Sequence, residues 1–349
     1  VLMESLIIPF FVAVLISVIM TPIIIKLAKK FGFMDIPKDN RRMHNKPIPL
    51  AGGLGMYITF VVSILIFAKV LKLTLSSEVI GLIAGSTVIV ISGLIDDKVG
   101  LSPKKKIIFQ LVAGICLVVG GVRIEFFNNP FNVGDPFIYI KYLSIPITLF
   151  WITGITNTIN LIDGLDGLAA GVSMICSISL MMIAYKFGYR EVAIIAAILA
   201  GSCLGFLPYN FNPAKIFMGD TGALFLGFVL SYISIEGVMK SVAILTIIVP
   251  VLILGVPVFD TAFAMVRRKL SGKSMVEADK GHLHHRLLAM GLSQRQTVLV
   301  LYTISIIFGI LANIISKFSA NQGLIVSIII FIVIIALGFI TGMFKTKGE

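Results

Sequence analysis

Charged residues are scarce in this chain, and their scarcity excludes most classes of protein. Only 13% of its 349 residues are charged, about half the share found in a soluble domain. Hydrophobic residues make up 58% and the mean hydropathy is +1.04, so a water-soluble fold is excluded. Cysteine is nearly absent as well. Its three occurrences lie inside apolar runs without Cys-x-x-Cys spacing, which is typical of small buried packing residues: Cys116, Cys176 and Cys203.

The chain consists largely of long apolar runs. Most are about 16 to 26 residues long, close to the roughly 20 residues that a helix needs to cross about 30 Å of hydrocarbon. The first run has no basic segment before it and no small-residue cleavage site after it, so we expect a retained span and not a signal peptide. We predict an all-α polytopic membrane protein, a single integral-membrane domain over residues 1–349, with about eleven spans: 6–27, 50–68, 79–95, 107–122, 143–162, 165–185, 192–208, 220–235, 241–266, 298–315 and 324–344.

The distribution of Lys and Arg predicts how these spans are oriented. Eleven spans divide the connections into two sets, of which one carries 21 basic residues and the other 8. Because basic loops stay on the cytoplasmic side, we expect the N-terminus outside and the C-terminus in the cytoplasm, in a bacterial inner membrane. The net charge of +12 is then largely a topology signal that also attracts anionic lipid and anionic substrate. No nucleic-acid partner is expected.

Two connections are long enough to have structure of their own. The outer connection at 123–142 contains two short alternating pieces, 123–127 and 137–140, which favour an external hairpin. The inner connection at 267–295 is long and basic, and its mixed polarity favours a short helix within a cytoplasmic loop.

Five of the 17 acidic residues fall at the inner ends of predicted spans, although they are far apart in the sequence. A carboxylate at the membrane edge is costly unless it is paired, hydrated or bound to a cation, so it marks a functional site by default. A helix cap or a topology determinant would explain any one of them, but explains five on one face poorly. We predict that these carboxylates converge on one site at the cytoplasmic membrane face: Asp96, Asp97, Asp163, Asp166 and Asp220.

The adjacent carboxylates of Asp96 and Asp97 favour phosphate chemistry. Neighbouring carboxylates repel each other unless a divalent cation or a lysine neutralises them, and such pairs commonly serve Mg²⁺-dependent reactions of phosphates. Lys106 follows closely and is a candidate phosphate ligand. For Lys104 and Lys105, a role as positively charged anchors is at least as good an interpretation.

The segment NTINLIDGLDGL at 157–168 predicts a ligand-binding turn. Asn157, Asn160 and Asp163 recur every three residues, which puts two amides and a carboxylate near one face where the span ends. Gly164 and Gly167 permit a tight turn in which the backbone approaches a ligand closely.

Two further segments carry candidate phosphate ligands. Asp220 precedes an apolar run and should lie at a helix N-terminus, where backbone N–H groups favour anions and a carboxylate can hold a metal. A simple N-cap is the alternative. His282, His284 and His285 cluster beside Arg286. We expect these histidines at a pyrophosphate and not at zinc, because neither a thiolate nor a clear His-x-x-x-His pair accompanies them.

Together these motifs resemble those of the polyprenyl-phosphate N-acetylhexosamine-1-phosphate transferase superfamily, over nearly the whole chain. The family's eleven-helix topology with the N-terminus outside agrees with the count above. The family's muramoyl-pentapeptide branch carries three consecutive histidines, which Leu283 interrupts here, so the chain is more similar to the branch that begins enterobacterial common antigen, O-antigen and wall teichoic acid. The resemblance rests on five segments in order: Pro47-x-Pro49-x-x-Gly52-Gly53; Asp96-Asp97 with Leu101-x-Pro103 and Lys106-x-x-x-Gln110; Asn157-x-x-Asn160-x-x-Asp163-Gly164-x-Asp166-Gly167; Pro213-Ala214-Lys215-x-Phe217-Met218-Gly219-Asp220; and His282-x-His284-His285.

The resemblance implies an activity and its partners. Such an enzyme transfers N-acetylhexosamine-1-phosphate, here by preference N-acetylglucosamine-1-phosphate, from a UDP-sugar to polyprenyl (undecaprenyl) phosphate in the bilayer. UMP is released, and the product begins cell-envelope glycan synthesis. Mg²⁺ is the implied cofactor with Mn²⁺ as an alternative, and a homodimer stays open. We favour direct attack by the lipid phosphate over a covalent intermediate, because a phosphate monoester is already largely dianionic at neutral pH.

The resemblance also implies roles for single residues. Asp220 would be the metal ligand, with Asp97 or Asp96 beside the metal and the lipid phosphate. Asp97 is favoured over Asp96 as the residue that takes or steers the acceptor's proton. The residues implied to line the nucleotide cleft are Asn160, Asp163, Gly164, Asp166 and Asn210, with Phe217 against the uracil. Those implied to hold the donor's phosphates are the catalytic candidate His282 with His284, His285 and Arg286. Lys106 would lie by the pyrophosphate or the acceptor, and Asn157 and Lys215 would make further contacts with the substrate.

Three alternatives stay open. The nearest is transfer of phospho-N-acetylmuramoyl-pentapeptide by the same chemistry. An ion-coupled transporter would also carry membrane carboxylates, but transport sites typically lie near the bilayer midplane between inverted repeats, whereas these motifs gather at one edge and no repeat is seen. A lipid-binding scaffold without a reaction is the third, and metal-dependent release of UMP would exclude it.

Overall fold

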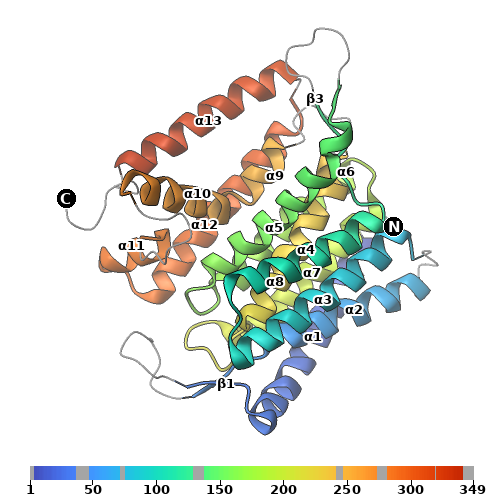
Figure 1. Ribbon diagram of the computed structural model, residues 1–349, viewed down its shortest axis with the longest axis vertical. Helices are drawn as coiled ribbons and strands as arrows, with labels where there is room; N and C mark the ends of the chain where they lie inside the picture. The colour runs from blue at the N-terminus through green and yellow to red at the C-terminus, as the bar shows by residue number, and fades with distance from the viewer. Residues whose placement is uncertain are drawn as a thin grey trace.

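The computed structural model describes residues 4–36, 47–70, 75–128, 137–240, 247–272, 281–318 and 320–340. The apolar runs form helices because a lipid-facing segment must satisfy its backbone hydrogen bonds internally. Figure 1 shows a tilted bundle with α13 along one edge. The helices are α1 (Glu4–Phe31), α2 (Gly52–Val70), α3 (Ser77–Val99), α4 (Pro103–Val119), α5 (Ser144–Ile162), α6 (Leu168–Lys186), α7 (Arg190–Asn210), α8 (Gly219–Ser234), α9 (Ile248–Ile253), α10 (Gly255–Leu270), α11 (Leu283–Ala289), α12 (Gln294–Ile315) and α13 (Ala320–Ile340), with a 3₁₀ turn at Lys141–Leu143 and a π-helical turn at Ile235–Met239.

The predicted polytopic class is confirmed. Within the described ranges, eight helices are long and apolar enough to cross a membrane: α1, α2, α3, α5, α6, α7, α8 and α12. Helix α8 lies at the centre, since it is buried along nearly its whole length and contacts α2, α3, α5 and α6. The count of eleven crossings and the outside position of the N-terminus stay predictions.

The prediction of one continuous span at 241–266 is wrong for the part that the structure describes, which begins at residue 247. The chain forms two helices there, α9 and α10, which meet at Leu254 and Gly255, and Figure 1 shows them running in different directions. Pro257 lies in the first turn of α10, where its missing N–H costs nothing, but it could not donate within a continuous helix. Gly255 leaves no room for a side chain against Phe308.

The connections carry two short antiparallel strand pairs. Strands β3 (Phe126–Asn128) and β4 (Phe137–Tyr139) pair and confirm the predicted hairpin, whose residues 129–136 lie outside the described part. Strands β1 (Met34–Asp35) and β2 (Ile48–Pro49) pair as well, which was not predicted. Figure 1 places β1 and β3 at opposite ends of the bundle.

The inner connection predicted at 267–295 is shorter than expected. Helix α10 continues to Leu270 and α12 starts at Gln294, because both helices extend past their apolar cores. Helix α11 confirms the predicted short helix within this connection, and residues 273–280 lie outside the described ranges.

Glycines let α8 approach its neighbours at the β1 end of the bundle. A side chain on Gly53 of α2 would collide with the backbone of Gly222, and one on Gly93 of α3 would collide with the backbone of Thr221. Small residues allow such close contact between membrane helices, where packing and not the hydrophobic effect drives association. The first turn of α8 is therefore held tightly between α2 and α3.

Candidate active site

A cavity of about 710 Å³ opens at the β1 end of the bundle, well within the range of small-molecule sites. All five carboxylates that the sequence predicts to converge line it, which confirms their convergence, while the cytoplasmic position of the site stays a prediction. The lining residues are Asp35, Ile48, Leu50, Asp96, Asp97, Lys106, Asp163, Gly164, Leu165, Asp166, Asn210, Asn212, Pro213, Ala214, Phe217, Met218, Gly219, Asp220, His285 and Gln294.

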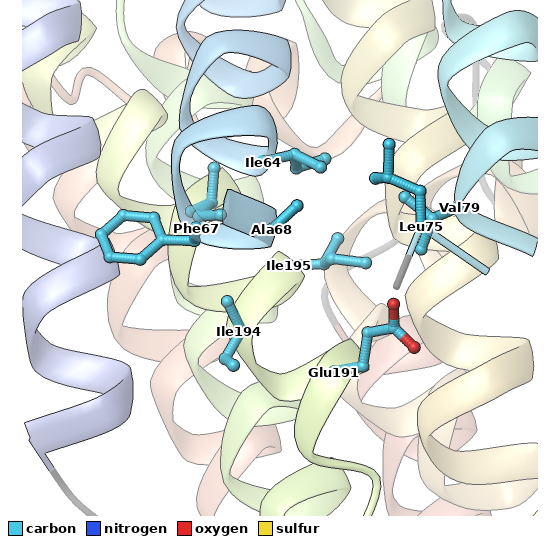
Figure 2. Close-up of a pocket in the computed structure, with 9 residues that line it drawn as sticks. Ile64, Phe67, Ala68, Leu75, Val79, Glu191, Ile194 and Ile195 are labelled. Carbon is cyan, nitrogen blue, oxygen red and sulfur yellow. The ribbon is translucent and has the colours of Figure 1, made fainter. Parts of the chain in front are cut away.

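A second hollow near the opposite end of the bundle is a poor candidate. It holds only about 20 Å³, which is room for little more than one water molecule. Figure 2 shows Glu191 as the single carboxylate among aliphatic and aromatic side chains from α2, α3, α7 and, just before α3, Leu75. The large cavity is therefore the site that the fold builds for a ligand.

Lys106 joins two of the carboxylates across the cavity. Its ammonium group contacts the carboxylates of Asp96 and Asp220, and the side-chain amide of Asn160 donates to Asp220 over 2.9 Å. Asp96 also accepts from the backbone N–H of Leu101 at 2.6 Å. Lys106 of α4 and Asn160 of α5 therefore hold the Asp220 carboxylate in one orientation together.

Asp97 supports the helix that carries Asp220. Its carboxylate accepts from the backbone N–H groups of Asp220 at 2.8 Å and Thr221 at 3.2 Å, and from the Thr221 hydroxyl at 2.6 Å. Gly219 has a φ of 70°, and a side chain on it would collide with the Asp97 carboxylate. The alternative that Asp220 is a simple N-cap is wrong, because Met218 holds that position without a side-chain bond. Asp97 of α3 satisfies the end of α8 instead.

The turn between α5 and α6 forms the next wall. Gly167 adopts a φ of 80°, which favours glycine, and its N–H donates to the Asn210 side chain at 3.1 Å. Asp166 accepts from the Asn212 amide at 3.0 Å and from the backbone N–H of Ala214 at 3.1 Å. Asp166 and Asn210 therefore join this turn to the connection between α7 and α8.

The histidine loop, which we define as residues 281–286 at the start of α11, forms another part of the cavity wall. His285 lines the cavity, while the ring of His284 packs against Gly164 and is 3% exposed. Burial lowers the pKa of His284 to about 4, and the neighbouring His285 acts in the same direction, so His284 is neutral at pH 7. The Nε of Arg286 donates to the Gly281 carbonyl at 3.0 Å.

Six predicted site residues are not among the described residues that line the cavity: Asn157, Asn160, Lys215, His282, His284 and Arg286. Asn157 forms a reciprocal pair of amide hydrogen bonds with Gln110, at 2.7 and 3.1 Å. Lys215 is exposed at the surface. His282 is buried against Asp260 of α10.

Sequence reasoning missed several residues that complete the site. Asn212 and Gln294 line the cavity and share a hydrogen bond of 2.7 Å, but a polar residue in a loop or at the first position of a helix gives no signal of its own. Asp260 lies inside an apolar run, and a carboxylate there was a signal that could have found it.

The charge balance of the cavity fits a divalent cation. Lys106 contacts the carboxylates of Asp96 and Asp220, and Asp97 and Asp166 line the same cavity, so carboxylates outnumber the lysine. Within the described ranges, no group of three or more His, Cys, Asp or Glu side chains could hold an ion by itself. Mg²⁺ typically takes one or two carboxylates and completes its shell with substrate phosphates and water, and the cavity offers at least that many carboxylates.

Asp163 gives the site a pH-dependent stability. Burial raises the pKa of its carboxyl from the ordinary 3.8 to about 8, and the negative charges of Asp220, Asp97 and Asp166 act in the same direction. The folded state therefore keeps a proton that the unfolded state loses near pH 4. The stability contributed by protonated Asp163 is fully present below that pH and is lost as the pH rises toward 8.

We expect the melting temperature of the metal-free protein in detergent to fall between pH 5 and pH 8, and Asp163→Asn to flatten that fall by several degrees. The amide cannot ionise, so the cost of burying a charge disappears. The exposed carboxylate variant Glu125→Gln should follow the wild-type curve. Parallel curves for wild type and Asp163→Asn would contradict this account.

Comparisons with known proteins find similar sequences over most of the chain. Residues 79–238 match the family described as glycosyl transferase family 4. A protein of Bacillus subtilis (strain 168) named "Probable undecaprenyl-phosphate N-acetylglucosaminyl 1-phosphate transferase" is 40% identical over 99% of this chain and 94% of its own length. The "Decaprenyl-phosphate N-acetylglucosaminephosphotransferase" of Mycolicibacterium smegmatis is 36% identical over 79% of this chain and 73% of its own. The "Phospho-N-acetylmuramoyl-pentapeptide-transferase" of Halalkalibacterium halodurans is 32% identical over 89% and 96%.

Proposed function

This chain belongs to the polyprenyl-phosphate N-acetylhexosamine-1-phosphate transferase superfamily, and we propose that it transfers N-acetylglucosamine-1-phosphate from UDP-N-acetylglucosamine to undecaprenyl phosphate. The products are a polyprenyl-pyrophosphate sugar and UMP. The reaction would take place at the cytoplasmic face of a bacterial inner membrane and begin the synthesis of a cell-envelope glycan.

One observation carries the proposal: five carboxylates and Lys106 line a single cavity at the end of a membrane-type helical bundle. The acceptor's tail lies in the bilayer and the sugar donor in water, so a site for both must lie at a membrane boundary. A transporter site near the bilayer midplane would not place all of these groups at one end of the bundle.

The reaction sets the tasks of the side chains. An oxygen of the lipid phosphate attacks the phosphorus bonded to the sugar, a new P–O bond forms, and the bond to UMP breaks. Lys106 would offset negative charge on the phosphates, because its ammonium group lies in the cavity wall, in contact with Asp96 and Asp220. His285 would donate to the donor's phosphates from the cavity wall, and Phe217, on the same wall, would lie against the uracil.

Asp220 and Asp97 would hold Mg²⁺, with the donor's phosphates completing its shell. When bound, the ion would offset the charge that builds on the phosphate oxygens. The protein's own part is to aim the Asp220 carboxylate through Asn160 and Lys106. The hydrogen bonds of Asp97 keep the first turn of α8 in place.

The nearest alternative is a muramoyl-pentapeptide donor, since relatives with that name are also similar. The deciding experiment uses the purified full chain, undecaprenyl phosphate, Mg²⁺ and a panel of UDP-sugars, with UMP as the readout. We expect UMP with UDP-N-acetylglucosamine only when the lipid is present. Release only with UDP-N-acetylmuramoyl-pentapeptide would support the alternative, and no release with any donor would refute a transferase.

We expect Gly164→Ala to lower the rate of UMP release by roughly a hundredfold, the scale set by a shift of about 1 Å at an active site. Its Cβ would lie 2.5 Å from the Nε2 of His284, so the histidine loop must move. The matched control is Gly154→Ala on α5, whose Cβ would meet nothing within 4 Å. Equal rates for the two variants would show that the contact with His284 is unimportant.

A further inference from the structure

Asp260 is a buried carboxylate that none of the roles above uses. It lies on α10 and is 3% exposed, beside a His282 side chain that is 6% exposed. Its Oδ2 lies 2.8 Å from the Nδ1 of His282, and its Oδ1 accepts from the backbone N–H of Leu283 at 2.6 Å. Both carboxylate oxygens are therefore engaged with the first residues of the histidine loop.

These contacts fix the chemical form of His282. A carboxylate can only accept, so the proton between the two groups belongs on Nδ1 of His282. The second bond satisfies an N–H at the start of α11, which has no partner within its own helix. Asp260 therefore sets the tautomer of His282 and the place where α11 begins.

Three neighbouring imidazole rings connect His282 to the cavity. The rings of His282 and His284 are nearly parallel, at 8° with centroids 5.9 Å apart, and those of His284 and His285 lie 4.2 Å apart. His284 rests on Gly164, and His285 lines the cavity. A change at His282 therefore alters the group that faces the ligand.

Helix α10 holds the loop at a second point. Arg267 lies two turns after Asp260 on the same buried face, and a side chain on Gly281 would collide with its guanidinium group. Two contacts from one helix thus bracket His282 on either side in the sequence. Because the chain breaks between α9 and α10, α10 runs in a different direction from α9. Helix α10 also packs against α5 and α12.

We propose that Asp260 is the positioning residue of the histidine loop. It holds His282 in the Nδ1–H tautomer and anchors α11, so that His284 stays packed on Gly164 and His285 keeps its place over the donor's phosphates. This inference deepens the proposed function and depends on it for its kinetic consequences. The tautomer can be tested without the reaction.

The first test is ¹⁵N NMR of the histidine rings in detergent. The chain has only four histidines, and the signal of His282 is assigned from its loss in His282→Gln. We expect the Nδ1–H tautomer in the wild-type protein. In Asp260→Asn the amide oxygen can still accept from Leu283, but an NH₂ group then faces Nδ1, so the Nε2–H tautomer should appear. An Nε2–H tautomer in the wild-type protein would overturn the proposal, even if the variant did not fold.

The second test is kinetic. Asp260→Asn should lower kcat for UMP release by roughly 10- to 100-fold with a smaller change in KM for the UDP-sugar. It should add little further loss in a His282→Ala background, because the two residues act as one unit. The control is the isosteric Thr261→Val, whose hydroxyl lacks a hydrogen-bond partner among the described residues.

The kinetic outcomes separate the two claims. Wild-type turnover in Asp260→Asn, or losses that simply add in the double variant, would refute the positioning role while the transferase stands. Absence of UMP release from the wild-type protein would refute the proposed function, and the NMR result would still decide whether Asp260 sets the tautomer.

Discussion

Replacement of Lys106 by methionine is expected to lower UMP release by about two to three orders of magnitude, the scale of losing one preorganised charge at a reacting group. Lys106 is the cation that joins Asp96 of α3 to Asp220 of α8. Methionine keeps much of the apolar length of the side chain but removes the charge. The two carboxylates would then repel each other and the incoming phosphates.

The chain supplies a matched control for this prediction. Lys105 precedes Lys106 on α4 and is exposed, so Lys105→Met makes the same chemical change outside the cavity. Initial rates at saturating donor and lipid should stay near the wild-type value for Lys105→Met. Both proteins should elute as single species from size-exclusion chromatography. A comparable loss in both variants would show that the general charge of this face matters and not the bridge between the carboxylates.

Asp220→Asn is expected to lower turnover by more than about a thousandfold. The amide has the same shape as the carboxylate, so the packing of α8 should survive. The substitution removes the negative charge that faces Lys106 and that would hold Mg²⁺. The amide of Asn160 also loses its charged hydrogen-bond acceptor. Chelator should abolish wild-type activity and added Mg²⁺ should restore it. No concentration of Mg²⁺ should rescue the variant.

A binding measurement supports the same prediction without turnover. Mg²⁺ with UDP-N-acetylglucosamine should raise the melting temperature of the wild-type protein, because a ligand stabilises the folded state that binds it. That increase should vanish in Asp220→Asn and persist in Glu125→Gln, which removes an exposed carboxylate. Chelator-resistant release of UMP, or normal turnover in Asp220→Asn, would refute the assigned role.

The sequence alone determined the class of fold and the end of the bundle where the chemistry lies. A span must be a long apolar run, so hydropathy locates the spans, and consecutive spans put alternate loops on the same side. Carboxylates at alternate span ends therefore had to share a face. Gly164 and Gly167 predicted the tight turn, and the alternating pieces on either side of residues 129–136 predicted the hairpin of β3 and β4.

The sequence was less informative about the histidine loop. The cluster of three histidines predicted a phosphate site, but only His285 lines the cavity. Asp260, the partner of His282, was counted among the residues of an apolar span. The break at Leu254 and Gly255 was not predicted either, because length and hydropathy do not distinguish a crossing helix from two shorter ones.

Only the tertiary structure decided which polar groups pair. Lys106 and Asp220 are 114 positions apart, and Asp97 and Thr221 are 124 apart, so no local spacing could join them. Their contacts depend on how closely α3, α4 and α8 approach, which is set by the fit of Gly93 against Thr221 and similar packing in three dimensions. Hydropathy restricts where a residue lies along the membrane normal. The identity of its neighbour follows from helix packing, to which residues from the whole chain contribute.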